Sequence, residues 1–215
     1  MTATVRAARR RHAAAIVAYA GAALYVVLLA ALHVVQPHRY DDATISKYAL
    51  GRDGWMLQAA FIAAGVAYAG LASLVQGRAR RLAWVSALAF VVMGFFKIDS
   101  VGPNKVVSLH GGLHTGAFFV VVVVTLWQMF VVRPEAHARA TRSLSYVALP
   151  LVITGFIVPG LAGAILFRAW TLSLVAWVVL VVHAGARSDL PPNGGTRVPG
   201  RRRTRRRASQ PASAR

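Results

Sequence analysis

Long apolar runs without charged side chains, separated by short basic clusters, constrain the fold of this chain more than any other feature. The first run extends from Ala13 to Val35 and contains no Lys, Arg, Asp or Glu. A helix of that length rises about 1.5 Å per residue and crosses a hydrocarbon core of about 30 Å. Charged residues make up only 14% of the chain, against about 25% in soluble domains, so lipid is the expected main solvent.

Six such runs predict six transmembrane helices, at about 13–35, 54–76, 82–96, 109–132, 144–162 and 169–186. The last two form one nearly continuous apolar stretch, which is about twice the length that one bilayer crossing needs. We therefore predict a helical hairpin there, with its turn near Gly163–Arg168. The expected fold is an all-α integral membrane bundle over 13–186. A basic arm, 1–12, precedes it, and the Pro, Gly, Ser and Arg content of the basic tail, 187–215, predicts disorder.

The distribution of basic residues predicts the orientation of the bundle. Most of the 25 Lys and Arg residues fall in 1–12, 77–81, 133–143 and 187–215, which share one side of a six-span bundle. Basic residues are enriched on the cytoplasmic side, so we expect a multi-pass protein of a bacterial plasma membrane with both termini in the cytoplasm. The same bias accounts for the net charge of +19, and no nucleic-acid partner is expected. The run Arg201–Arg207 is expected to attract anionic lipids of the inner leaflet.

The segment between the first two runs predicts a short helix on the outer surface of the membrane. Asp42 is placed to cap this helix and Gly51 to end it. Its apolar side would carry Ile45, Tyr48 and Ala49. We expect the helix to lie flat at the level of the lipid headgroups.

Ionisable side chains gather at the predicted outer ends of the spans, where such groups are costly and tend to be functional. His33 lies near the outer end of the first span, and Asp99 follows the third. His110 and His114 begin the fourth span, and their spacing of four places both on one face of a helix. These side chains should point into the bundle and approach one another.

The expected site is one outward-opening pocket lined by Asp99, His110 and His114, with Ser46 and Arg168 near its mouth. Imidazole and carboxylate suit zinc with an open position for water, and the absence of cysteine excludes thiolate ligands. Two other uses remain open. Each imidazole can instead hydrogen-bond a neighbouring helix, and Asp99 can instead form an ion pair with the basic residues beside it.

Four motifs follow one another between about Val17 and Ala186. They are Asp42–Gly51 with Gly54-Trp55, Phe96–Asp99, Leu109–His114 and Gly163–Arg168. Their order and spacing resemble a family of small bacterial and archaeal membrane proteins of about six spans, catalogued as domain of unknown function 998. The resemblance implies that the positions to examine are Ser46, Asp99, His110, His114 and Arg168. Lys47 and Lys97 depart from the family pattern, which usually has an acid and a proline there.

Three functions are compatible with these features. The first is a non-enzymatic membrane protein whose polar pocket binds a lipid headgroup, an ion or a partner. The second is an intramembrane metal-dependent hydrolase of a lipid or amide, by loose analogy with membrane ceramidases. The third is a small transporter, although the two three-helix halves show no sequence repeat. The sequence does not determine an oligomeric state.

Overall fold

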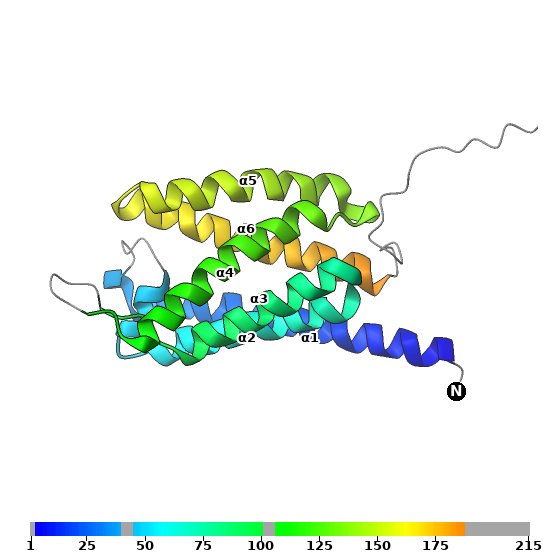
Figure 1. Ribbon diagram of the computed structural model, residues 1–215, viewed down its shortest axis with the longest axis horizontal. Helices are drawn as coiled ribbons and strands as arrows, with labels where there is room; N and C mark the ends of the chain where they lie inside the picture. Colours follow the sequence, from blue (N-terminus) through cyan, green and yellow to red (C-terminus); the bar gives the residue numbers. More distant parts are fainter. Residues whose placement is uncertain (1–2, 40–44, 101–105, 188–215) are drawn as a thin grey trace, which may run out of the picture.

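The computed structural model describes residues 3–39, 45–100 and 106–187 and consists of six long α-helices and three short 3-10 helices (Figure 1). In chain order they are α1 (Ala3–Val35), η1 (Pro37–Arg39), η2 (Ile45–Leu50), α2 (Gly54–Leu74), α3 (Gly77–Phe95), α4 (Leu109–Val131), η3 (Glu135–His137), α5 (Ala138–Ile157) and α6 (Gly160–Ala186). Within these described ranges there is no β-strand, so the prediction of an all-α protein is confirmed.

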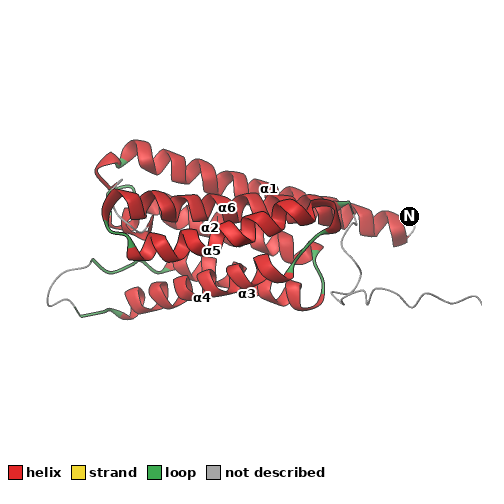
Figure 2. Ribbon diagram, turned by 90° about the horizontal axis from the view of Figure 1, so that it is seen from above, coloured by secondary structure: helices red, strands yellow, loops and turns green. Residues whose placement is uncertain are grey.

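The helices form a closed ring in the order of the sequence. Each packs against the next from α1 to α6, α6 packs back against α1, and α2 touches α6 across the middle. The connections therefore gather at two ends (Figures 1 and 2). We name the end that carries η1, η2 and the α5–α6 turn the η2 end. The opposite end, the termini end, carries the N-terminus and the last residues of α6.

Five of the described helices are long and apolar enough to cross a membrane, namely α1, α2, α4, α5 and α6. The bounds predicted for the spans in α2 and α4 agree with the helices to within two residues. The remaining helix, α3, begins with Gly-Arg-Ala-Arg-Arg and does not meet the same criteria. Its outward side is nevertheless apolar, since Leu88 is 66% exposed. The sixth span therefore stays a prediction.

The turn between the last two helices differs from the sequence-based prediction. We expected it near Gly163–Arg168, but α5 ends at Ile157 and α6 begins at Gly160. Val158 has extended backbone angles, as a residue before proline favours, and Pro159 stands at the N-cap of α6. Gly160 has a φ of +67°, which a residue without a Cβ adopts readily.

This correction moves Arg168 from a loop into a helix. It lies about two turns inside α6, a helix apolar enough to span the membrane. The sequence does not indicate this placement, because apolar residues continue on both sides of the turn that the structure shows. Arg168 is consequently a charged residue inside a helix that is long and apolar enough to cross a membrane, which changes the chemistry expected of it.

The segment predicted to lie flat on the surface is instead packed into the bundle. Residues 40–44 lie outside the described ranges, and the rest forms η2. Its predicted apolar side is covered, largely by α2, and Tyr48 is completely buried. Ser46 is buried with it. The predicted disordered tail also lies outside the described residues, except for Arg187.

Small residues bring α1 and α2 into close contact. A Cβ placed on Gly21 would lie 2.6 Å from the carbonyl oxygen of Ala63. A Cβ on Gly70 would lie 2.7 Å from the backbone nitrogen of Ala18. Each helix therefore needs a glycine at the point where the other's backbone passes.

Candidate functional site

His114 lies in the second turn of α4 and faces the interior of the bundle, with only 1% of its surface exposed. Its Nε2 atom is 2.9 Å from the hydroxyl oxygen of Ser46 on η2. Its Nδ1 atom is 2.7 Å from the carbonyl oxygen of Phe96 and 3.2 Å from that of Met93. Carbonyl oxygens only accept hydrogen bonds, so Nδ1 carries the proton. Nε2 is then the acceptor, and the Ser46 hydroxyl donates to it.

The end of α3 explains why His114 adopts this arrangement. The last carbonyl groups of a helix have no partner within the helix. Met93 and Phe96 lie at the C-terminal end of α3, and His114 donates to both of their carbonyls. Three segments thereby meet at one imidazole: the end of α3, the start of α4, and η2.

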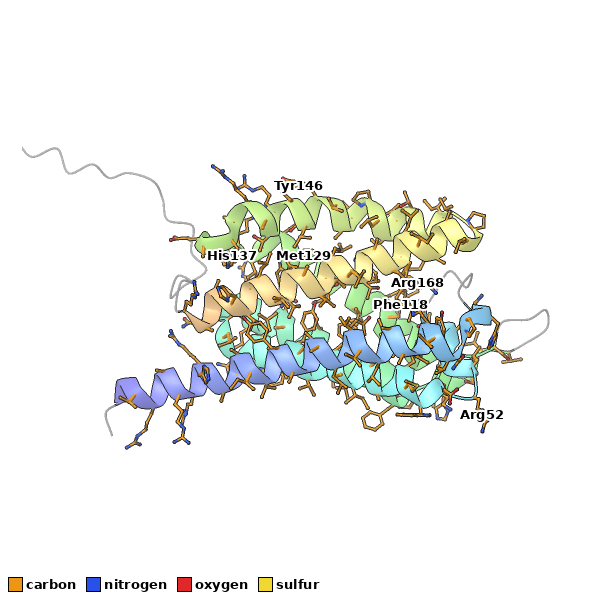
Figure 3. The ribbon with its side chains drawn as sticks, turned by 180° about the vertical axis from the view of Figure 1, so that it is seen from behind. Arg52, Phe118, Met129, His137, Tyr146 and Arg168 are labelled. Carbon is orange, nitrogen blue, oxygen red and sulfur yellow. The ribbon has the colours of Figure 1, made fainter. Side chains whose placement is uncertain are left out.

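A second set of contacts joins Arg168 of α6 to His33 of α1. Figure 3 labels Arg168 at the η2 end of the bundle. The Arg168 Nε donates to Nε2 of His33 at 2.7 Å. The His33 Nδ1 is 2.6 Å from the Leu29 carbonyl, so it donates there and leaves Nε2 as the acceptor. An Arg168 Nη2 donates to the Tyr48 hydroxyl at 3.4 Å, and the guanidinium carbon lies 5.9 Å from the centre of the Tyr48 ring. His33 and Tyr48 thus both help to orient the cation.

A cavity of about 270 Å³ adjoins Arg168. It is named here the α1–α6 cavity and is lined by Tyr25, Val26, Leu29, Ala30, His33, Ile45, Arg168, Thr171 and Leu172. Apart from Ile45, all of these residues belong to α1 or α6. Leu172 and Ala30 are exposed, so the rim of the cavity reaches the outer face of the bundle.

A smaller cavity of about 30 Å³ lies beside Ser46 and is named here the Ser46 cavity. Its other lining residues include Phe61, Phe118 and Trp170. It shares Tyr25, Ile45 and Thr171 with the α1–α6 cavity, so the two cavities are neighbours. The indole Nε1 of Trp170 is buried and has no hydrogen-bond partner among the described residues. The Trp177 indole and the Tyr68 hydroxyl are also buried without a partner in the described structure, but they do not line this cavity, whereas Trp170 does.

Asp99 makes a different kind of contact at the start of α4. It accepts from the Ser108 backbone N–H at 2.7 Å and from the Ser108 hydroxyl at 2.6 Å. The Ser108 hydroxyl in turn accepts from the Gly111 N–H and caps the helix. The two bonds from Ser108 hold the pKa of the Asp99 carboxyl below its ordinary value. A carboxylate also suits the positive end of the α4 dipole.

The expected pocket is divided in the structure. Ser46 meets His114, and His33 meets Arg168, whereas Asp99 bonds to Ser108. His110 is exposed, with its ring 5.5 Å from that of Phe96. Of the cavities described above, none is lined by Asp99, His110 or His114.

Zinc ligation by His110, His114 and Asp99 stays a prediction. Within the described ranges no three His, Asp or Glu side chains are grouped to hold a metal ion. Both ring nitrogens of His114 are engaged, so a metal there would have to displace Ser46 or the α3 carbonyls.

Sequence reasoning did not assign a site role to Tyr48, Trp170, Tyr25 or Thr171. The sequence pattern places Tyr48 only on the apolar side of the predicted surface helix. The hydroxyl groups of Tyr25 and Thr171 stand within apolar runs, which was the available signal for polar groups turned inward. Nothing in the sequence distinguishes Trp170 from an interfacial tryptophan, because the missing partner of its N–H appears only in the packed structure.

These features define an α-helical membrane protein in which two sets of polar contacts, Ser46 with His114 and Arg168 with His33, lie beside cavities at the η2 end. The chain belongs to the family described as "Protein of unknown function (DUF998)", whose model matches residues 4–184. The match confirms the resemblance drawn from the four motifs. No curated protein and no solved structure matches the chain.

Proposed function

We propose that this protein binds an anionic amphiphile, such as a phospholipid, in the α1–α6 cavity near the outer surface of a bacterial plasma membrane. We also propose that both termini lie in the cytoplasm, as the distribution of basic residues favours. The observation that carries the proposal is the position of Arg168, held by His33 and Tyr48 at a largely apolar cavity.

The charge at this position favours an anionic ligand. An arginine within a membrane span is costly and usually serves binding or transport. Its planar guanidinium has several donors arranged to meet a phosphate or carboxylate with two hydrogen bonds at once. His33 and Tyr48 fix the direction in which these donors point. An ordered cation loses less conformational entropy when a ligand binds.

The remainder of the cavity favours an apolar portion in the same ligand. Val26, Leu29 and Leu172 contribute aliphatic walls beside the arginine. A volume of about 270 Å³ is near the lower limit for small-molecule sites and suits a headgroup with the first carbons of its chains. The exposed rim between α1 and α6 gives such a molecule a route from the bilayer.

Native mass spectrometry of the purified protein with phosphatidylglycerol and phosphatidylcholine of identical acyl chains tests the proposal. The wild type should retain phosphatidylglycerol preferentially. Arg168→Gln should reduce that preference about tenfold to a hundredfold, since a hydrogen bond to a charged group contributes about 1.5–3 kcal/mol. Arg168→Lys should fall between the two, because lysine keeps the charge and loses the planar fork.

Two tryptophan variants on α1 distinguish lipid binding in the cavity from lipid binding elsewhere on the helix surface. Ala30→Trp introduces a large ring at the rim of the cavity and should lower binding. Ala23→Trp places the same ring on an exposed part of α1 outside the cavity lining and should leave binding unchanged. Equal retention of both lipids by the wild type, or an unchanged preference in Arg168→Gln, would contradict the proposal.

A further inference from the structure

We propose that Ser46 is a nucleophile activated by His114, and that the pair hydrolyses a carboxylic ester. The reactivity of the pair is independent of the function proposed above. The substrate class, an ester carried by an anionic amphiphile, rests on the proposed function.

The geometry has the three parts that an activated hydroxyl requires. The nucleophile and base are within hydrogen-bond reach, with 2.9 Å between the Ser46 oxygen and Nε2 of His114. The lone pair of the base faces the hydroxyl, because Nδ1 carries the ring proton. A third group orients the base, here the carbonyls of Phe96 and Met93 in the place where many hydrolases use a carboxylate.

The Ser46 cavity supplies a place for the reacting carbonyl group. Ser46 and Trp170 both line it, and the Trp170 N–H is buried without an acceptor in the described structure. A donor left unpaired in the resting protein can bond to the negative charge that develops on a carbonyl oxygen during attack. The Trp170 N–H would thereby gain an acceptor when the ester carbonyl is attacked.

The position of the pair connects it to the Arg168 site. Ser46 and Tyr48 are both on η2, and Tyr48 contacts Arg168. The Ser46 cavity also shares Tyr25 and Thr171 with the α1–α6 cavity. An amphiphile whose anionic group meets Arg168 would therefore bring a nearby ester toward Ser46.

The reaction proceeds in two balanced steps. The Ser46 oxygen bonds to the ester carbonyl carbon while its proton passes to Nε2 of His114. The ester C–O bond then breaks, and the alcohol leaves with that proton, which gives an acyl-Ser46. Water attacks the acyl carbon, again through His114, and the proton returns to the Ser46 oxygen as the acyl group leaves as a carboxylic acid.

A short alkyl fluorophosphonate, which carries no anionic headgroup, tests the nucleophile in the full-length protein. The expected result is one covalent adduct, mapped to Ser46 by peptide mass spectrometry. Ser46→Ala and His114→Gln should abolish it. Ser86→Ala should be labelled like the wild type, because Ser86 is also buried but bonds to Gln128 and not to a histidine. Trp170→Phe should slow labelling by roughly a hundredfold, as expected for the loss of one oxyanion donor.

The fluorophosphonate distinguishes the two proposals because it carries no anionic headgroup. An adduct on wild-type Ser46 would support the Ser46–His114 pair even if phospholipid binding had failed in the earlier experiment. A lipid preference that depends on Arg168, without any adduct on Ser46, would support the binding proposal alone. Absence of an adduct on wild-type Ser46, or an adduct unaffected by His114→Gln, would overturn the further inference.

The absence of cysteine permits a second test that does not depend on the fluorophosphonate. Ser46→Cys introduces a single thiol, and its alkylation by iodoacetamide can be followed against pH. Beside an intact His114, the thiol should react with an apparent pKa below the ordinary value of about 8.5. The double variant Ser46→Cys/His114→Gln should shift the profile to higher pH. Superimposable profiles would show that His114 does not act as a base.

Discussion

The polar side chains at the η2 end differ in what each of them stabilises. Asp99 and Ser108 satisfy the N-terminus of one helix, α4. His114 joins three separate segments through one imidazole. Arg168 and His33 link the first and last long helices, which are adjacent only because the ring closes. Each contact therefore predicts a different consequence when it is removed.

Asp99→Asn should lower the melting temperature of the protein near neutral pH, because it removes the negative charge at the start of α4. The pKa of the folded-state carboxyl is depressed, so its contribution is present at pH values above the ordinary pKa. It is lost as the pH falls through the folded-state pKa. The difference in melting temperature between wild type and variant should thus be larger at pH 7 than at about pH 3, as measured by scanning fluorimetry.

Asp53→Asn is the matched control for this change. Asp53 stands at the N-cap of α2, but its side chain makes no capping hydrogen bond. Its substitution should have a smaller effect on the melting temperature at pH 7. An equal effect at both positions would show that general surface charge, and not the Ser108 contacts, is responsible.

At the scale of the elements, the sequence predicts helices well where their ends are marked. The runs that became α2 and α4 end near charged residues, Gly or Pro, and their bounds agree closely with the structure. The predicted position of the α5–α6 turn was wrong because the residues on both sides of Pro159 are apolar and do not mark a turn. The arrangement within the site could not be derived in the same way. Periodicity places His114 on a face of α4. It does not predict that the carbonyls of Met93 and Phe96 and the hydroxyl of Ser46 lie within hydrogen-bond distance of the imidazole.

Gly21→Leu should destabilise the bundle, since a side chain at this position meets the backbone of α2 at Ala63 and Ala67. Overpacking of this kind typically costs about 1–3 kcal/mol, and the cost is higher where backbone atoms must move. The expected result is a lower melting temperature and a shift toward aggregated protein in size-exclusion chromatography.

Gly116→Leu provides the comparison on α4. A Cβ at Gly116 meets no atom within 4 Å, so the same substitution should be neutral or slightly stabilising through improved helix propensity. If the two variants melt at the same temperature, the close approach of α1 and α2 does not contribute to stability.

At the scale of the whole molecule, the positive-inside bias makes a prediction about orientation. A reporter fused after Arg215 should register as cytoplasmic. Cysteines introduced singly at Asp42 or Asn104 should react with an impermeant maleimide added to intact cells. Labelling of a C-terminal cysteine under these conditions would reverse the orientation, or show that the number of spans is odd.

Deletion of residues 190–215 should leave insertion of the protein unchanged. The basic residues in the arm and in the two other predicted inner segments remain and keep the same bias. The measurement is the amount of membrane-inserted protein and its melting temperature, compared with the full chain. A loss of inserted protein would assign the tail a role in folding.

The exposed rim of the α1–α6 cavity determines which concentration scale applies to a ligand that binds there. A molecule that enters between two membrane helices arrives by lateral diffusion within one leaflet. Its mole fraction among the surrounding lipids, and not its molarity in the buffer, then sets the occupancy. Addition of neutral detergent or phosphatidylcholine at constant total ligand should empty the cavity by surface dilution. Measured affinities would accordingly be comparable only at a fixed ratio of ligand to total amphiphile.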